Sequence, residues 1–146
     1  MTDSNSGADL RHQERVSLMQ LLFAHTFIEN TEQVLDEEMD PKQVRTLEEI
    51  KANLSLIDQE IAVQAAERPL GEINKVDLAI MRLIIYEAKH KDTPKKVLID
   101  EAVELAKEFG TDSSPKFVNG VLGKILFKES DSAEDLIADQ AVEKEE

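Results

Sequence analysis

The sequence predicts an all-α fold, a compact single-domain helical bundle of about six to seven helices. Three observations lead to this prediction. Apolar residues recur at spacings of three and four over most of the chain, which places them on one face of a helix. The sequence contains neither alternating strand patterns nor tight glycine hairpins. At 146 residues, the chain can bury a core without disulfides or metal ions.

The first helix is predicted from Asp9 to about Glu29, because its apolar residues from Val16 onward form one face. Residues 1–8 are small and polar without periodicity, so we expect a disordered N-terminal tail. The segment 30–66 has further helical spacing, and Pro41 divides it into a short helix followed by one or two longer helices.

A central helix is predicted from about Lys75 to His90, after Pro69 and Gly71 interrupt the pattern. Its apolar residues leave little polar face, which is typical of a helix in the middle of a bundle. Two charged residues on this helix, Arg82 and Glu87, have apolar neighbours in the sequence. We therefore interpret them as paired structural charges and not as a catalytic acid and base.

Two more helices are predicted between Thr93 and Leu126, and their apolar faces should pack against each other. Thr93 and Pro94 favour the start of the first of these helices, since a threonine oxygen can cap free amides. Gly110 marks its end. Gly120 lies inside the last helix, where glycine costs about 1 kcal/mol relative to alanine, so we expect a close helix crossing there.

The chain is strongly acidic, with a formal net charge of −14. Residues 129–146 contain eight acidic residues and one lysine, a net charge of −7, and we expect an acidic, disordered C-terminal tail after a domain that covers residues 9–128. The domain itself is then also acidic. General affinity for nucleic acid is therefore excluded, and binding to RNA requires a local basic patch.

Catalytic and metal-binding patterns are missing from the sequence. It has no cysteine, no glycine-rich phosphate loop and no pair of histidines within helical reach. We expect no enzyme activity, no cofactor and no metal site. No apolar run approaches the roughly 20 residues of a membrane helix, so we also expect no membrane association.

Three sequence blocks occur in order along the chain: DLAIMRLIIYE from Asp77, IDEAVELAKEFG from Ile99 and KFVNGVL from Lys116. Together they resemble the NusB family of bacterial antitermination factors over about residues 9–127. This resemblance implies a NusB-like, cytoplasmic, all-helical RNA-binding protein. It also implies pairing with NusE, a small-subunit ribosomal protein, and recognition of the single-stranded boxA element of ribosomal RNA transcripts within the RNA polymerase antitermination complex.

The resemblance places an RNA site on three elements: the start of the first helix, the loop after the central helix and the start of the last helix. An aromatic side chain such as Phe117 can stack on an unpaired base, although a place in the core is the alternative for this residue. For the lysines, the alternative is a solvated loop. The predicted RNA-binding residues are Arg11, His12, Arg15, Lys91, Lys95, Lys96, Lys116, Phe117 and Asn119.

For the protein partner, Phe23 and Asp77 match family positions that face NusE. The alternative for Phe23 is a place in the core, and the alternative for Asp77 is a role only at the positive end of its own helix. Where relatives often have a tryptophan before the central helix, this chain has Arg68, to which we assign no role. The alternative function is a protein-interaction module or homodimer whose RNA binding is weak or masked.

Overall fold

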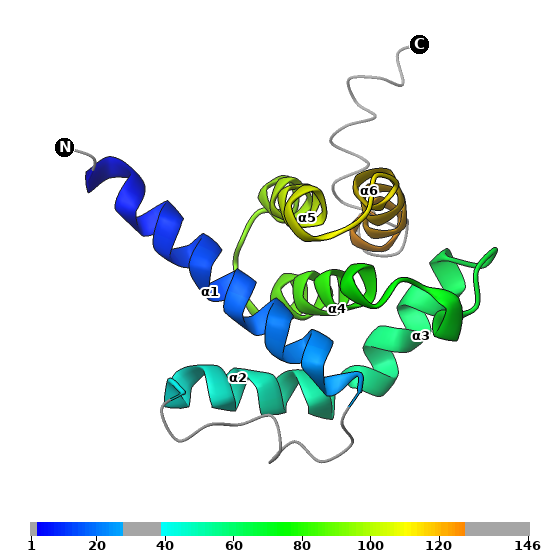
Figure 1. The fold of residues 1–146 in the computed structure, drawn as a ribbon, viewed down its shortest axis with the longest axis horizontal. Coiled ribbons are helices and arrows are strands. Elements are labelled where there is room, and N and C mark those ends of the chain that lie inside the picture. The colour runs from blue at the N-terminus through cyan, green and yellow to red at the C-terminus, as the bar shows by residue number, and fades with distance from the viewer. Residues whose placement is uncertain (1–2, 28–38, 128–146) are drawn as a thin grey trace, which may run out of the picture.

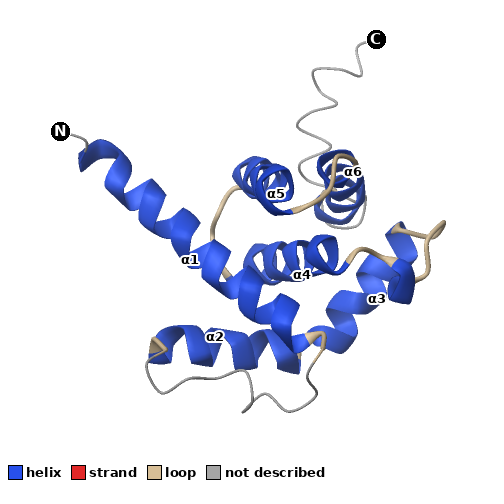
Figure 2. Ribbon diagram, viewed as in Figure 1, coloured by secondary structure: helices blue, strands red, loops and turns tan. Residues whose placement is uncertain are grey.

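The computed structural model describes residues 3–27 and 39–127, with side chains from residue 7 onward in the first range. These ranges contain six α-helices, a short 3-10 turn (η2, Leu70–Glu72) and no strand, which confirms the predicted all-α fold (Figure 2). The acidic segment 129–146 lies outside the described residues. Of the described helices, none combines the length and hydropathy needed to cross a membrane.

The first helix, α1 (Asp3–His25), begins earlier than the predicted start at Asp9. Residues 3–8 are helical where we expected a disordered tail; they contain no proline, so the hydrogen-bond ladder of the helix extends backward through them. The buried Met19 and Leu22 attach α1 to the core. Its N-terminal end projects beyond the other helices, as Figure 1 shows.

Pro41 is the first residue of the second helix, α2 (Pro41–Ala52), where proline costs no hydrogen bond. The carboxylate of Asp40 caps this helix by accepting a hydrogen bond from the backbone N–H of Lys42 at 2.9 Å. The third helix, α3 (Leu54–Gln64), follows after a single residue. The short helix predicted before Pro41 falls on residues that the structure does not describe.

The central helix, α4 (Lys75–His90), has the predicted bounds. Asn74 caps it, accepting hydrogen bonds from the N–H groups of Val76 and Asp77 at 2.8 and 3.1 Å. Every residue from Asp77 to Glu87 is buried, and α4 contacts each of the other five described α-helices. The prediction that this helix lies at the centre of the bundle is confirmed (Figure 1).

The last two helices, α5 (Lys95–Phe109) and α6 (Ser114–Leu126), pack against each other as predicted. Gly110 ends α5, and its N–H donates to the carbonyl of Ala106 at 2.9 Å. The predicted cap at Thr93 is wrong, because α5 begins one residue after Pro94 without a side-chain cap. The Thr93 hydroxyl instead donates to the Glu87 carboxylate at 2.9 Å.

Both charged residues predicted as structural on α4 have ion-pair partners on other helices. Arg82 donates two hydrogen bonds to Asp58 of α3, from Nε at 2.9 Å and from Nη2 at 2.8 Å. Glu87 pairs with Arg15 of α1. The structure confirms that these groups are paired structural charges, and each pair joins two helices, since a bidentate guanidinium–carboxylate pair fixes the orientation of both side chains.

Candidate nucleic-acid interface

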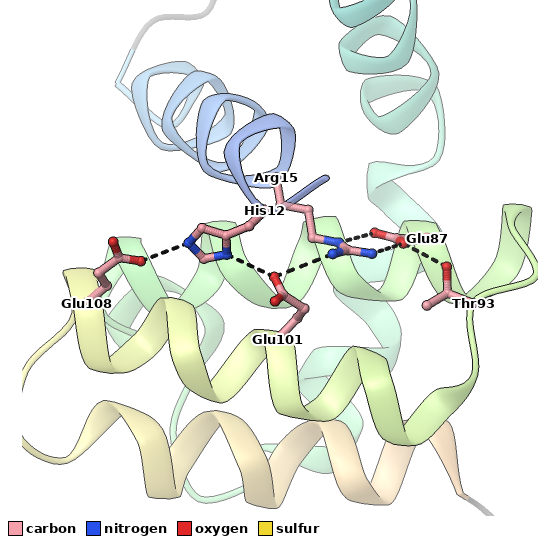
Figure 3. A network of polar contacts seen from close by, with 6 residues as sticks. All are labelled: His12, Arg15, Glu87, Thr93, Glu101 and Glu108. Atoms are coloured by element: carbon pink, nitrogen blue, oxygen red, sulfur yellow. Dashed lines mark hydrogen bonds and ion pairs between the residues drawn. The ribbon is translucent and has the colours of Figure 1, made fainter. Parts of the chain in front are cut away.

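Arg15, a predicted RNA-binding residue, is buried in an ion pair that joins α1 to α4 (Figure 3). Its Nε donates to Oε1 of Glu87 at 2.9 Å and its Nη2 donates to Oε2 at 2.7 Å. Thr93 also donates to this carboxylate. Burial alone would raise the pKa of Glu87, but the hydrogen bonds and charge of Arg15 hold it below its ordinary value. The guanidinium of Arg15 is thus paired with carboxylates of the protein itself.

His12, one turn before Arg15, lies between two carboxylates of α5 (Figure 3). Its Nδ1 is 3.1 Å from Oε1 of Glu101, and its Nε2 is 3.2 Å from Oε1 of Glu108. The hydrogen bond to Glu101, followed by the contacts with Glu108, raises the pKa of His12 above 6.5 although burial opposes this. Since Glu101 also lies 3.4 Å from Nη1 of Arg15, one carboxylate serves both cations.

Arg11 has a different environment, because its side chain is exposed and lines a pocket between α1, α2 and α4. Lys91, which follows the last residue of α4, lines the same pocket, and the Arg15–Glu87 pair forms part of its wall. The pocket volume is about 190 Å³. We call it the α1–α2–α4 pocket. Two of the predicted cations, Arg11 and Lys91, thus meet at the C-terminal end of α4.

The other predicted lysines of this region point elsewhere. Lys95 lies over the ring of Phe127, with its Nζ 5.7 Å from the ring centroid. Lys96 is highly exposed and pairs with Asp100 on its own helix at 3.8 Å. The basic cluster seen in the sequence therefore divides among separate parts of the surface, as a loop and the first turn of a helix turn successive side chains in different directions.

Phe117 on α6 is half-buried and packs against the core on one side. On the other side the guanidinium carbon of the exposed Arg68 lies 4.2 Å from its ring centroid. The two residues line a hollow of about 470 Å³ together with Lys116 and Lys124. We call these four residues and the hollow the α6 groove. It gathers three cations around one aromatic ring, and Glu67 is its one acidic lining residue.

Gly120 also lines the α6 groove, and the predicted close helix crossing at this position is wrong. A Cβ added there would meet nothing within 4 Å, apart from its own helix and chain neighbours. The absence of a side chain keeps the groove open one turn away from Phe117. Asn119, also predicted to bind RNA, is exposed on α6 outside the lining of this groove.

The two residues predicted to face the protein partner, Phe23 and Asp77, differ in burial. Phe23 is partly buried against the core and meets the exposed Phe27 edge to face, with ring centroids 5.1 Å apart. Asp77 is only 2% exposed, and its Oδ1 has no hydrogen-bond partner among the described residues. Burial raises the pKa of Asp77, against the lowering effects of a hydrogen bond from Ser114 and the charge of Arg68. Asp77 is thus a buried carboxyl within electrostatic reach of Arg68.

The predicted RNA-binding residues therefore form two separate surfaces. Arg11 and Lys91 meet near the end of α4, whereas Lys116 and Phe117 lie near its start, where Asp77 is within electrostatic reach of Arg68. The α1–α2–α4 pocket begins on α4 at Leu83, in the middle of the helix, and shares no lining residue with the α6 groove.

Sequence reasoning missed Arg68 and the acidic partners of His12. Arg68 is distant in sequence from Phe117, and helical periodicity carries no information about contacts between elements. A weak signal was present for α5, because Glu101 and Glu108 are separated by two helical turns and so lie on one face.

Comparison with known proteins gives three consistent findings. The model of the NusB family matches residues 12–127. The transcription antitermination protein NusB of Campylobacter concisus is 37% identical over 124 residues, which cover 79% of this chain and 95% of that protein. That of Campylobacter curvus is 39% identical, covering 77% and 92%. A solved structure of T. maritima NusB matches with a TM-score of 0.71 and 38% identity, covering 81% of this chain and 91% of that one.

Proposed function

Because the chain belongs to the NusB family, we propose that it binds boxA RNA of ribosomal RNA transcripts as a heterodimer with NusE. Its function is transcription antitermination, the activity named for its relatives, and it is not an enzyme. It acts as a member of an antitermination complex. We place this activity in the cytoplasm, where the transcript emerges from RNA polymerase.

The α6 groove supports the RNA part of this proposal more than any other surface. The observation that carries the proposal is the stack of Arg68 on Phe117, with 4.2 Å between the guanidinium carbon and the ring centroid. Lys116 and Lys124 flank this stack. Unpaired bases stack on aromatic rings and on the flat guanidinium of arginine, while lysines contact phosphates. Because the core and Arg68 cover the Phe117 ring, we assign base stacking to the exposed Arg68 guanidinium, which Phe117 supports, and phosphate contacts to the two lysines. Asn119 lies at the margin of this surface.

The basic residues of α1 have a different role in this proposal. Arg15 and His12 position α1 against α4 and α5 through Glu87, Glu101 and Glu108, so they hold the surface in place without being free to meet a phosphate. Arg11 and Lys91 supply the exposed charge at this end of the molecule. Lys95 and Lys96 contribute long-range attraction, which salt screens.

For the protein partner, we propose that NusE contacts the exposed end of α1 around Phe23 and Phe27. Aromatic side chains provide large contact areas at interfaces, and Phe27 is 63% exposed. Asp77 supports the neighbouring surface from below, through its electrostatic link with Arg68. The same exposed aromatic end would serve a homodimer if the chain were an interaction module only.

The test is RNA binding of the full chain, with and without NusE, to a boxA oligonucleotide and a scrambled control over a salt series. We expect tighter binding to boxA, and a further gain with NusE. Phe117→Ala removes the ring that supports the Arg68 guanidinium and should weaken boxA binding about 5- to 150-fold, because stacking contributes about 1 to 3 kcal/mol per base. Phe127→Ala is the matched control, since it removes a phenylalanine just beyond the other end of α6. Equal binding of both oligonucleotides, even with NusE, would favour the interaction module or homodimer.

A further inference from the structure

We propose that the α1–α2–α4 pocket holds one unstacked base of a single-stranded RNA. This inference rests on the proposed function and adds to it a second base site, which shares no lining residue with the α6 groove. It is argued from the size of the pocket, from the groups that line it and from the charge at its rim.

The size of the pocket limits its occupant to one small ring. Sites for drug-sized ligands have volumes of about 300 to 1,000 Å³, and this pocket has about 190 Å³. Its walls come from three helices that are far apart in the sequence, and two of these helices are joined at the pocket by the Arg15–Glu87 pair. The pocket is therefore a fixed feature of the bundle and does not need a ligand in order to form.

The lining combines apolar side chains with groups that can form hydrogen bonds to the edge of a base. Leu18, Leu83 and Tyr86 supply the apolar surface. The Tyr86 ring is held in place, because its hydroxyl donates to Glu49 and the ring stacks on His90 at 4.4 Å. Such a rigid aromatic wall suits a planar ring.

Two polar side chains of α2, Gln43 and Thr46, line the same pocket. The Gln43 amide makes one long hydrogen bond, from Nε2 to the carbonyl of Glu14 at 3.5 Å, which leaves its amide oxygen available. The Thr46 hydroxyl donates to the carbonyl of Lys42 at 3.0 Å and keeps its oxygen as an acceptor. A base presents both donors and acceptors on its edges, and these groups match that pattern.

The charge at the rim favours RNA over a peptide as the occupant. Arg11, Lys42 and Lys91 line the pocket, and the described residues offer none of them an ion pair. Of the three carboxylates in the lining, that of Glu87 is compensated by Arg15 and that of Asp40 caps α2, while Glu14 is exposed. Three cations against this one carboxylate leave the rim positive on a chain of net charge −14, and a positive rim attracts an anionic polymer, whose phosphates flank every base.

The experiment is an abasic scan of the boxA oligonucleotide against the full chain with NusE. Each position in turn is replaced by a ribose without a base, and its affinity is compared with that of the intact RNA. We expect one abasic position to cost the unaltered chain about tenfold in affinity. In Thr46→Met, which fills the pocket with a flexible apolar side chain, that cost should fall to about twofold or less while the other positions keep theirs. Gln43→Ala, which removes only the amide, should also reduce the affinity cost at the same abasic position.

A matched pair of charge variants on α2 tests the rim. Lys42→Gln should reduce the dependence of log affinity on log salt by about one unit, the effect of one lost phosphate contact. Arg45→Gln removes an equal charge one turn away, on an exposed side chain that lines none of the described pockets, and should leave the salt dependence unchanged.

The outcomes separate this inference from the proposed function. If the unaltered chain prefers boxA but its abasic profile is the same in Thr46→Met and Gln43→Ala, the pocket holds no base. If these variants no longer bind NusE but keep the abasic profile of the unaltered chain, the pocket is a protein contact. The inference is then again overturned. Absence of any preference for boxA in the unaltered chain would instead contradict the proposed function itself.

Discussion

The buried pair between Arg15 and Glu87 yields the most direct prediction about stability. Arg15→Met keeps an apolar side chain of similar length and removes the charge, leaving the Glu87 carboxylate uncompensated in a site where its side chain is only 10% exposed. Breaking a buried pair in this way costs about 3 to 5 kcal/mol. Since Thr93 still donates to the carboxylate, we expect the lower end, about 3 kcal/mol.

Urea unfolding measures this loss. With a slope of about 2 kcal/mol per molar urea, the midpoint should fall by roughly 1.5 M. The double variant Arg15→Met, Glu87→Met should recover to within about 1 kcal/mol of the unaltered chain, because apolar side chains of similar volume can replace a buried ion pair.

The pH dependence gives an independent check on the same pair. The folded pKa of Glu87 is lowered, so the pair stabilises the protein above the unfolded pKa near 4.5, and this contribution disappears as the pH falls through the folded pKa. In Arg15→Met the carboxylate is buried without its cation, so its pKa should rise, and the cost of the substitution should shrink on acidification. An unfolding midpoint within about 0.3 M of the unaltered chain, combined with a loss of RNA affinity, would refute this reasoning.

Three further predictions concern single residues. Gly120→Ala should stabilise the fold by up to about 1 kcal/mol in urea unfolding, because the new methyl group meets empty space and alanine favours the helix; a lower midpoint would show that the site is crowded. The raised pKa of His12 means that its contacts stabilise the fold fully below pH 6.5 and that this contribution disappears as the pH rises through the folded pKa; His12→Gln should remove this slope from a stability profile, and an NMR titration with a pKa at or below 6.5 would contradict it. Lys96→Gln should change the unfolding free energy by less than about 0.5 kcal/mol, since its pair with Asp100 is exposed, and a larger effect would disprove this weak role.

Helical periodicity predicted the fold well because burial repeats with the geometry of the helix. The bounds of α4, the end of α5 at Gly110 and the pairing of α5 with α6 all follow from local spacing and from residues that begin or end helices. The cap at Thr93 was predicted wrongly, since a carboxylate six residues earlier in the chain competes for the same hydroxyl. Local sequence contains no information about that competition.

The candidate site was harder to predict, because it depends on contacts between elements. The sequence indicates that His12 and Arg15 are basic, but their availability depends on Glu101 of α5, which the fold brings to them. Likewise, Phe117 has the environment of a stacking residue only because Arg68 comes to lie over its ring. The residue types were predictable, whereas their partners required the tertiary structure.

The position of α4 has a consequence for measurement by amide hydrogen exchange. A helix that contacts all five of the other described α-helices can expose its amides only when the whole bundle opens, so its exchange should report the global free energy of unfolding. A bound ligand raises that free energy by mass action wherever it binds. The slowest amides of α4 would therefore register RNA at the α6 groove and at the α1–α2–α4 pocket alike, and added protection in α2 or α6 would tell the two apart.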